Sequence, residues 1–184
     1  IVVSTNPAVT VDNAATGTLS IINPLTLSGS GQAATVLVPT TNTGSDSAAV
    51  FDATGANGKF TVTDLTIAGA GRQLGAAVAF RNGGQGTVAR VSITNTSFAA
   101  ADPSTGTAVL VTAPGGLVTV SASTLTGYGR AGVSVTDGTV VVSGSTITGR
   151  GVGDFRNIGV EVLGASSVGI RAASGWAAED VRSW

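Results

Sequence analysis

Short apolar runs recur along the chain at a fixed internal spacing. Residues 140–162, VVVSGSTITGRGVGDFRNIGVEV, contain two β-branched runs separated by a Ser143-Gly144 corner, then a loop and a third alternating run. Val142 and Ile147 lie five residues apart, each in one of the first two runs. The same five-residue step joins Val120 to Leu125, Ile93 to Phe98 and Val62 to Ile67. A fixed offset with length changes confined to one loop is typical of a solenoid.

The three runs of each repeat predict three short strands, each paired in parallel with the next repeat at a spacing of about 4.8 Å. Apolar side chains would then stack in columns through a narrow core. The predicted columns are Val62, Ile93, Val120 and Val142; Ile67, Phe98, Leu125 and Ile147; and Val78, Val109, Val133 and Val160. The sequence therefore predicts an all-β fold, a single-stranded parallel β-helix of about six coils.

We expect one domain over residues 1–184. Its parts would be an opening coil over 1–29, a long loop insertion over 30–47 that includes a strand-like TVLV, regular coils over 48–170, and a C-terminal cap or truncated coil over 171–184. Trp176 and Trp184 would cover the last coil, because an open solenoid end exposes core and unpaired strand edges.

The repeated V-x-V/I, corner, x-T-I/L, loop and G-V-x-V units from Phe60 to Ile170, preceded by NPLTLSGSG, resemble the right-handed parallel β-helix of the pectin-lyase-like superfamily. The resemblance implies a right-handed coil. That superfamily includes pectate lyases, polygalacturonases, epimerases, tailspikes, adhesins and autotransporter passengers, so architecture alone does not give an activity. The Gly/Thr/Ser-rich style is more similar to its adhesins, passengers and tailspikes than to its enzymes.

The amino-acid composition excludes several kinds of functional site. The chain has no cysteine and no histidine, which excludes disulfides, thiolate metal sites and histidine-based acid–base catalysis. Nine basic and ten acidic residues give a net charge of -1 without a basic run, so no nucleic-acid partner is expected. The apolar runs are shorter than the roughly 20 residues of a membrane span. Low charge and abundant Thr, Ser and Gly favour an extracellular or cell-surface location.

The loop before the third run carries most of the candidate binding side chains. They are Arg72, Asp102, Tyr128, Arg130, Arg150, Asp154, Phe155 and Arg156. Arginines and aromatic rings along one edge would suit a uronate or sulfated glycan, with forked donors on the acid group and rings against the sugars. The alternative is that they are solvated loop tips with internal Arg–Asp pairs of little energetic value.

An enzyme is the second hypothesis. A polysaccharide lyase, hydrolase or epimerase would act through Asp154, Glu161, Arg156 and Arg130, with Arg150 beside them. Two carboxyl groups must lie within roughly 5–10 Å for glycoside hydrolysis, and Asp154 with Glu161 is the best pair. No cofactor is expected. A calcium site is not supported, because Asp12, Asp52 and Asp64 fall in different columns.

Two outward surfaces give further hypotheses. Ala77, Ala79, Ala108 and Leu110 would form an uncharged strip for a homo-oligomer or an end-to-end filament. Threonine and serine ranks would suit ice binding, although threonine is also a good exposed strand residue. The first rank is Thr66, Ser97, Thr124 and Thr146, with Thr126 and Thr148 beside it and Ala68 and Ala99 interrupting it; the second is Thr61, Ser92 and Thr119.

These patterns together favour a secreted or cell-surface structural or binding module. Its expected task is glycan attachment or self-assembly, and its expected partner is a polysaccharide or cell-surface glycan. Catalysis on an acidic glycan and ice binding are the alternatives.

Overall fold

The computed structural model describes residues 9–11, 18–43, 48–70, 72–96, 105–150, 158–171 and 181–183. All regular structure in these ranges is β-strand, in three sheets. Sheet A contains β3 (Leu25–Ser28), β6 (Lys59–Thr63), β9 (Gln85–Ala89), β12 (Leu117–Ser121), β15 (Thr139–Ser143) and β18 (Ser167–Arg171). Sheet B contains β1 (Val9–Val11), β4 (Val36–Pro39), β7 (Thr66–Ala68), β10 (Ser92–Thr94), β13 (Thr124–Thr126) and β16 (Thr146–Thr148). Sheet C contains β2 (Leu19–Ile21), β5 (Ala49–Thr54), β8 (Ala76–Arg81), β11 (Thr107–Thr112), β14 (Ala131–Thr136), β17 (Ile158–Leu163) and β19 (Val181–Ser183).

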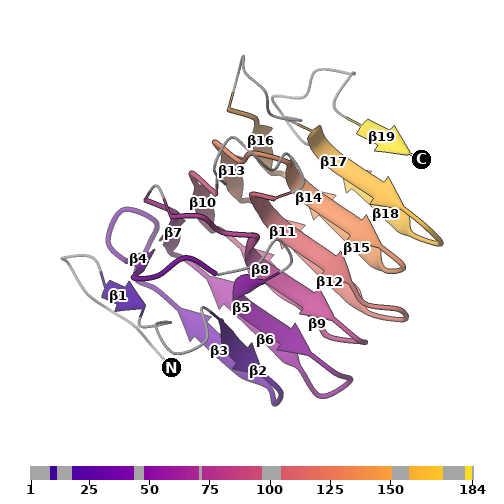
Figure 1. The fold of residues 1–184 in the computed structure, drawn as a ribbon, viewed down its shortest axis with the longest axis horizontal. Coiled ribbons are helices and arrows are strands. Elements are labelled where there is room, and N and C mark those ends of the chain that lie inside the picture. Colours follow the sequence, from indigo (N-terminus) through magenta and orange to yellow (C-terminus); the bar gives the residue numbers. More distant parts are fainter. Residues whose placement is uncertain are drawn as a thin grey trace.

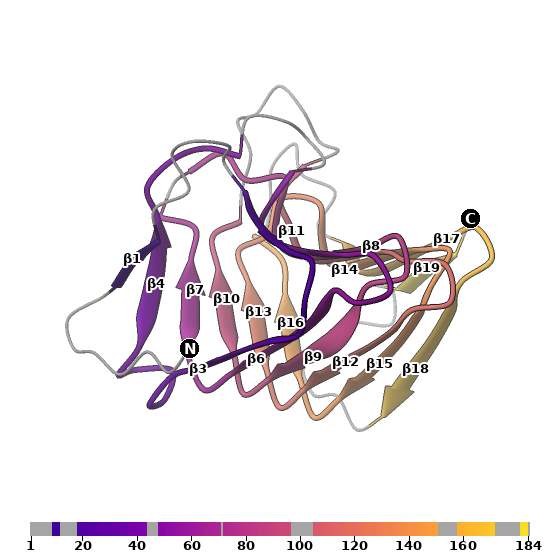
Figure 2. The ribbon, with the colours of Figure 1, turned by 90° about the horizontal axis from the view of Figure 1, so that it is seen from below.

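The chain visits sheets C, A and B in turn, and each strand pairs in parallel with the corresponding strand of the next coil. Figure 1 shows this progression from the indigo N-terminal coil to the yellow C-terminal one, and Figure 2 shows the sheets around a narrow interior. The predicted all-β parallel β-helix of about six coils is therefore confirmed. Among the described residues, no helix has the length and apolarity to cross a membrane.

Stacked apolar side chains fill the interior, as the sequence pattern indicates. Sheet A contributes Leu27, Val62, Val88, Val120 and Val142; sheet B contributes Leu37, Ile67, Ile93, Leu125 and Ile147; and sheet C contributes Phe51, Val78, Val109, Val133 and Val160. The predicted sheet C column is confirmed. Stacking of these side chains in register excludes water from the interior that they line.

The second coil has a different frame from the predicted one. Ile93 pairs with Ile67 and Leu125 in sheet B, and Val88 takes the sheet A position expected for Ile93. The cause is Gly86, which stands where neighbouring strands have apolar side chains and so hides β9 in the sequence pattern. The expected sheet B residue Phe98 lies outside the described residues.

Two other segments contribute strands to the sheets. Val36–Pro39, within the predicted loop insertion 30–47, forms β4 and pairs with β1 and β7. Val181–Ser183, within the predicted cap, forms β19 and pairs with β17. Trp176 and Trp184 lie outside the described residues.

The predicted alanine strip is not an exposed surface. Ala77, Ala79 and Ala108 are all 0% exposed, and Leu110 is partly buried. Ala77 and Ala108 belong to the main core together with their neighbours Val78 and Val109. Two consecutive residues therefore contact the core at this point of sheet C, and strict in–out alternation fails. The predicted assembly contact required these alanines to be exposed, and that requirement is wrong.

Candidate functional site

The outer face of sheet A is rich in hydroxyl groups and carries no acidic side chain. Its outward positions on the six strands are Thr26, Ser28, Lys59, Thr61, Thr63, Gln85, Thr87, Ala89, Leu117, Thr119, Ser121, Thr139, Val141, Ser143, Ser167, Gly169 and Arg171. Lys59 and Arg171 are the charged members, and both are cations. This face is therefore uncharged or positive over its whole described length.

A shallow hollow of about 260 Å³ lies on this face across β6, β9 and β12. Its lining residues are Lys59, Thr61, Gln85, Gly86, Thr87, Leu117 and Thr119. The volume is slightly below the roughly 300–1,000 Å³ of pockets that enclose drug-sized ligands. A ligand of more than one or two rings would therefore lie partly in solvent, as an extended polymer does.

Strand pairing sets the spacing of the lining side chains. Lys59 pairs with Gln85, and Thr61 and Thr119 flank Thr87 in the row beside them. Leu117 lies two residues before Thr119 on β12, and it therefore continues the row that contains Lys59 and Gln85. Neighbouring strands are about 4.8 Å apart, and the two rows are about 6.6 Å apart along a strand. The hollow is thus a regular grid of six side chains.

The polar groups of this grid are available to a ligand. Lys59 is exposed, and neither its ammonium group nor the Gln85 amide has a partner within the described part of the chain. The same holds for the hydroxyl groups of Thr61, Thr87 and Thr119. Leu117 adds an apolar contact, because its side chain is 49% exposed.

Gly86 forms part of the hollow and is fixed there by the core beneath it. A Cβ at this position would lie 1.9 Å from the Phe60 carbonyl oxygen and 2.6 Å from Phe80 Cε1. The Phe80 ring therefore occupies the space that an inward side chain would need. Glycine is required at this position by packing.

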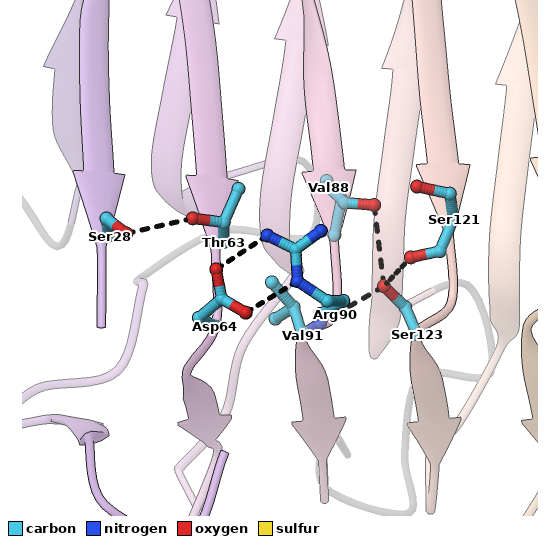
Figure 3. A network of polar contacts seen from close by, with 8 residues as sticks. All are labelled: Ser28, Thr63, Asp64, Val88, Arg90, Val91, Ser121 and Ser123. Atoms are coloured by element: carbon cyan, nitrogen blue, oxygen red, sulfur yellow. Dashed lines mark hydrogen bonds and ion pairs between the residues drawn. The ribbon is translucent and has the colours of Figure 1, made fainter. Parts of the chain in front are cut away.

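A charged corner borders sheet A at the point where each coil turns from sheet A to sheet B (Figure 3). Arg90 donates hydrogen bonds from Nε and Nη2 to the two Asp64 carboxylate oxygens, at 2.6 and 2.7 Å. These hydrogen bonds hold the pKa of Asp64 below its usual value. Both residues have positive φ and occupy equivalent corners of successive coils.

Behind this corner, a serine hydroxyl replaces an apolar side chain. Ser123 Oγ donates to the Ser121 carbonyl oxygen at 2.8 Å and accepts from the Val91 amide at 3.2 Å (Figure 3). Ser28 and Thr63 share a further hydrogen bond of 3.1 Å across neighbouring strands. These contacts are structural, because they satisfy polar groups at the turn and hold the edge of sheet A in register.

The structure separates the predicted loop residues into different environments. Arg72 and Arg150 are exposed, whereas Tyr128 is 1% exposed and cannot stack on a sugar. The stacking role expected for Tyr128 is therefore wrong. Asp102, Asp154, Phe155 and Arg156 lie outside the described residues.

Two members of the catalytic hypothesis do meet on sheet C. Arg130 Nε and Nη2 each lie 2.8 Å from Glu161 Oε2, and Ser134 Oγ donates to the same oxygen at 2.8 Å. Glu161 is 1% exposed. This arrangement is an internal Arg–Glu ion pair on sheet C, and Ser134 joins β14 to β17 through the same carboxylate oxygen.

A second ion pair lies at the N-terminal end of the same sheet. Arg81 Nε lies 3.1 Å from Asp52 Oδ2, while Asp52 Oδ1 is buried without a hydrogen-bond partner in the described part of the chain. Burial raises the pKa of Asp52, and the positive charge of Arg81 offsets this effect only in part. No cluster of three or more metal-ligating side chains occurs among the described residues.

No protein-family model, curated protein or solved structure matches the chain. Sequence reasoning missed Lys59, Gln85 and Leu117, which follow the C-to-A turn. One signal was available, because Lys59 is the single lysine of the chain and directly precedes an apolar run.

Proposed function

We propose that the protein is a secreted or cell-surface β-helix module that attaches to polysaccharides bearing acidic sugars. The hollow on sheet A is the observation that carries this proposal. It combines one cation, one amide, three free hydroxyl groups and one exposed apolar side chain in a regular grid. The resemblance to the pectin-lyase-like superfamily is consistent with a glycan ligand.

Each part of the grid has a match on a sugar chain. The Lys59 ammonium group would bind a carboxylate or sulfate as a point charge. The Gln85 amide and the threonine hydroxyls both donate and accept hydrogen bonds, as sugar hydroxyls do. Leu117 would cover the apolar C–H face of a ring and lose part of its exposed surface. One hollow thus offers acid, hydroxyl and apolar recognition together.

The surroundings of the hollow favour an extended, anionic polymer. The outward positions of sheet A carry no acidic side chain, so they would not repel an acidic chain that continues beyond the hollow. Because the hollow crosses three strands, such a polymer would run along the coil axis rather than along one strand. Binding would then strengthen with oligosaccharide length until the outward face is covered.

Calorimetric titration with a galacturonate hexamer, its methyl ester and a sulfated hexamer of equal length tests this proposal. We expect the wild-type protein to prefer the charged hexamers. Lys59→Gln should weaken their binding roughly fivefold, or about 1 kcal/mol, because one charge-assisted hydrogen bond is lost at an exposed site. Lys59→Arg should retain binding, and higher salt should reduce it.

Two further variants separate this face from the rest of the molecule. Leu117→Ala should weaken both acidic and esterified hexamers, since it removes apolar contact rather than charge. Thr124→Ala, on the outer face of sheet B, is the matched control and should change nothing. Equal binding by wild type, Lys59→Gln and Leu117→Ala, or no binding to any of the hexamers, would refute attachment through sheet A.

A further inference from the structure

The outer face of sheet B carries a second regular array of side chains. Some of its members differ from those that the sequence pattern predicts. The sequence pattern places Ser97 beside Thr124, with Ala99 interrupting the next rank. In the structure Ser92 pairs with Thr124, and Thr94 pairs with Thr126. Ser97 and Ala99 lie outside the described residues. The hydroxyl ranks are therefore continuous over β10, β13 and β16.

These three strands form a grid of six hydroxyl side chains. One rank is Ser92, Thr124 and Thr146, and the other is Thr94, Thr126 and Thr148. Parallel pairing sets about 4.8 Å between neighbours in a rank, and about 6.6 Å separates the two ranks. Both repeats are fixed by the backbone, so the grid keeps its dimensions without any ligand.

All six hydroxyl groups are free to bind water. None of these side chains has a hydrogen-bond partner within the described part of the chain, and all are at least partly exposed. Thr66 in the preceding coil differs, because its hydroxyl donates to the Gln32 carbonyl oxygen at 2.8 Å. The free array therefore begins at β10.

The array also has no charge. No outward residue of β7, β10, β13 or β16 is ionisable, whereas the outer face of sheet A carries Lys59 and Arg171. A charged side chain would orient water around itself and disturb a regular layer. A neutral grid of hydroxyl and methyl groups has no such effect, so it would allow water to take repeated positions.

We propose that this grid on sheet B binds ice. Water oxygens on ice surfaces form two-dimensional arrays with repeats of the same order as those of the grid. Waters held by the six hydroxyls would join such a surface, and the threonine methyl groups would fill the spaces between them. The proposal is independent of polysaccharide attachment, because it uses another sheet and no charged group.

Measurement of ice-crystal shape and of the gap between melting and freezing temperatures tests this proposal. Wild-type protein should shape ice crystals and produce a gap that increases with concentration. Thr126→Lys, at the centre of the second rank, should reduce the gap at least fivefold. Ala68→Thr should enlarge it, because Ala68 pairs with Thr94 and a hydroxyl there extends the rank by one coil.

Val141→Lys, on the outer face of sheet A and outside the hollow, is the matched control, and circular dichroism should confirm that every variant folds. Loss of ice shaping in Thr126→Lys with activity retained in Val141→Lys supports the assignment. Absence of any gap for wild-type protein would overturn the proposal. Equal loss in both variants would overturn the assignment to sheet B.

Discussion

Gly86 connects the core to the candidate site at the scale of a single residue. Its missing side chain leaves room for the Phe80 ring inside and places backbone in the hollow outside. The same glycine removes the apolar residue that would have marked β9 in the sequence. One packing requirement therefore explains both the shape of the site and the incorrect frame predicted for the second coil.

Gly86→Ala should destabilise the protein by roughly 3 kcal/mol or more, because overpacking against backbone forces a shift of the strand. Gly169→Ala is the control in the same sheet. A Cβ there would meet its nearest neighbour, Val141 Cγ2, at 3.9 Å, an ordinary contact. Urea denaturation of both variants measures the difference. Equal stability of the two would contradict the packing role of Phe80.

At the scale of secondary-structure elements, the ion pair between Arg90 and Asp64 joins the corners that follow β6 and β9. Asp64 has a lowered pKa, so its ionised form favours the folded state. That contribution is present above the ordinary aspartate pKa and is lost as the pH falls through the lowered value. The corner is therefore held most firmly at neutral pH.

Asp64→Asn should lower stability at pH 7, and the difference from wild type should disappear as the solution is acidified. Denaturation midpoints measured between about pH 7 and pH 2 give this profile.

Asp52 should show the opposite pH dependence. Its pKa is raised, so its contribution to folding stability is lost as the pH rises through the raised value. In a comparison with Asp52→Asn, wild type should therefore gain stability on acidification. Parallel profiles for the two variants would contradict the assigned shifts.

The sequence predicted elements well wherever apolar residues alternate without interruption. Val78, Val109, Val133 and Val160 were placed in one column of sheet C on that basis, and they pair as expected. The alanine strip was misplaced because Ala77 and Ala108 share the core with their neighbours. A sequence pattern shows alternation but not the point at which a strand turns a second residue inward.

The candidate site was less predictable than the fold. Charged and aromatic loop residues attract attention in a sequence, yet Tyr128 is buried and Arg130 pairs with Glu161. The hollow depends instead on which side chains become neighbours across coils. Lys59 and Leu117 are far apart in the chain, and only the correct frame of β9 places them in the same row.

At the scale of the whole molecule, one register positions both candidate faces. The frame of β9 and β10 places Thr87 beside Thr119 on sheet A and Ser92 beside Thr124 on sheet B. The frame expected from the sequence would place Ser92 beside Thr119 instead. The hollow and the hydroxyl grid would both be lost in that frame.

Disulfide formation between engineered cysteines tests this register most directly, because the chain has no cysteine of its own. Neighbouring parallel strands place paired Cα atoms about 4.8 Å apart, within the roughly 4.4–6.8 Å range of disulfides. After mild oxidation, mass spectrometry should detect a bond in Thr87→Cys/Thr119→Cys and in Ser92→Cys/Thr124→Cys, but none in Ser92→Cys/Thr119→Cys. A bond in the third pair without one in the first two would contradict the register and both proposed binding faces.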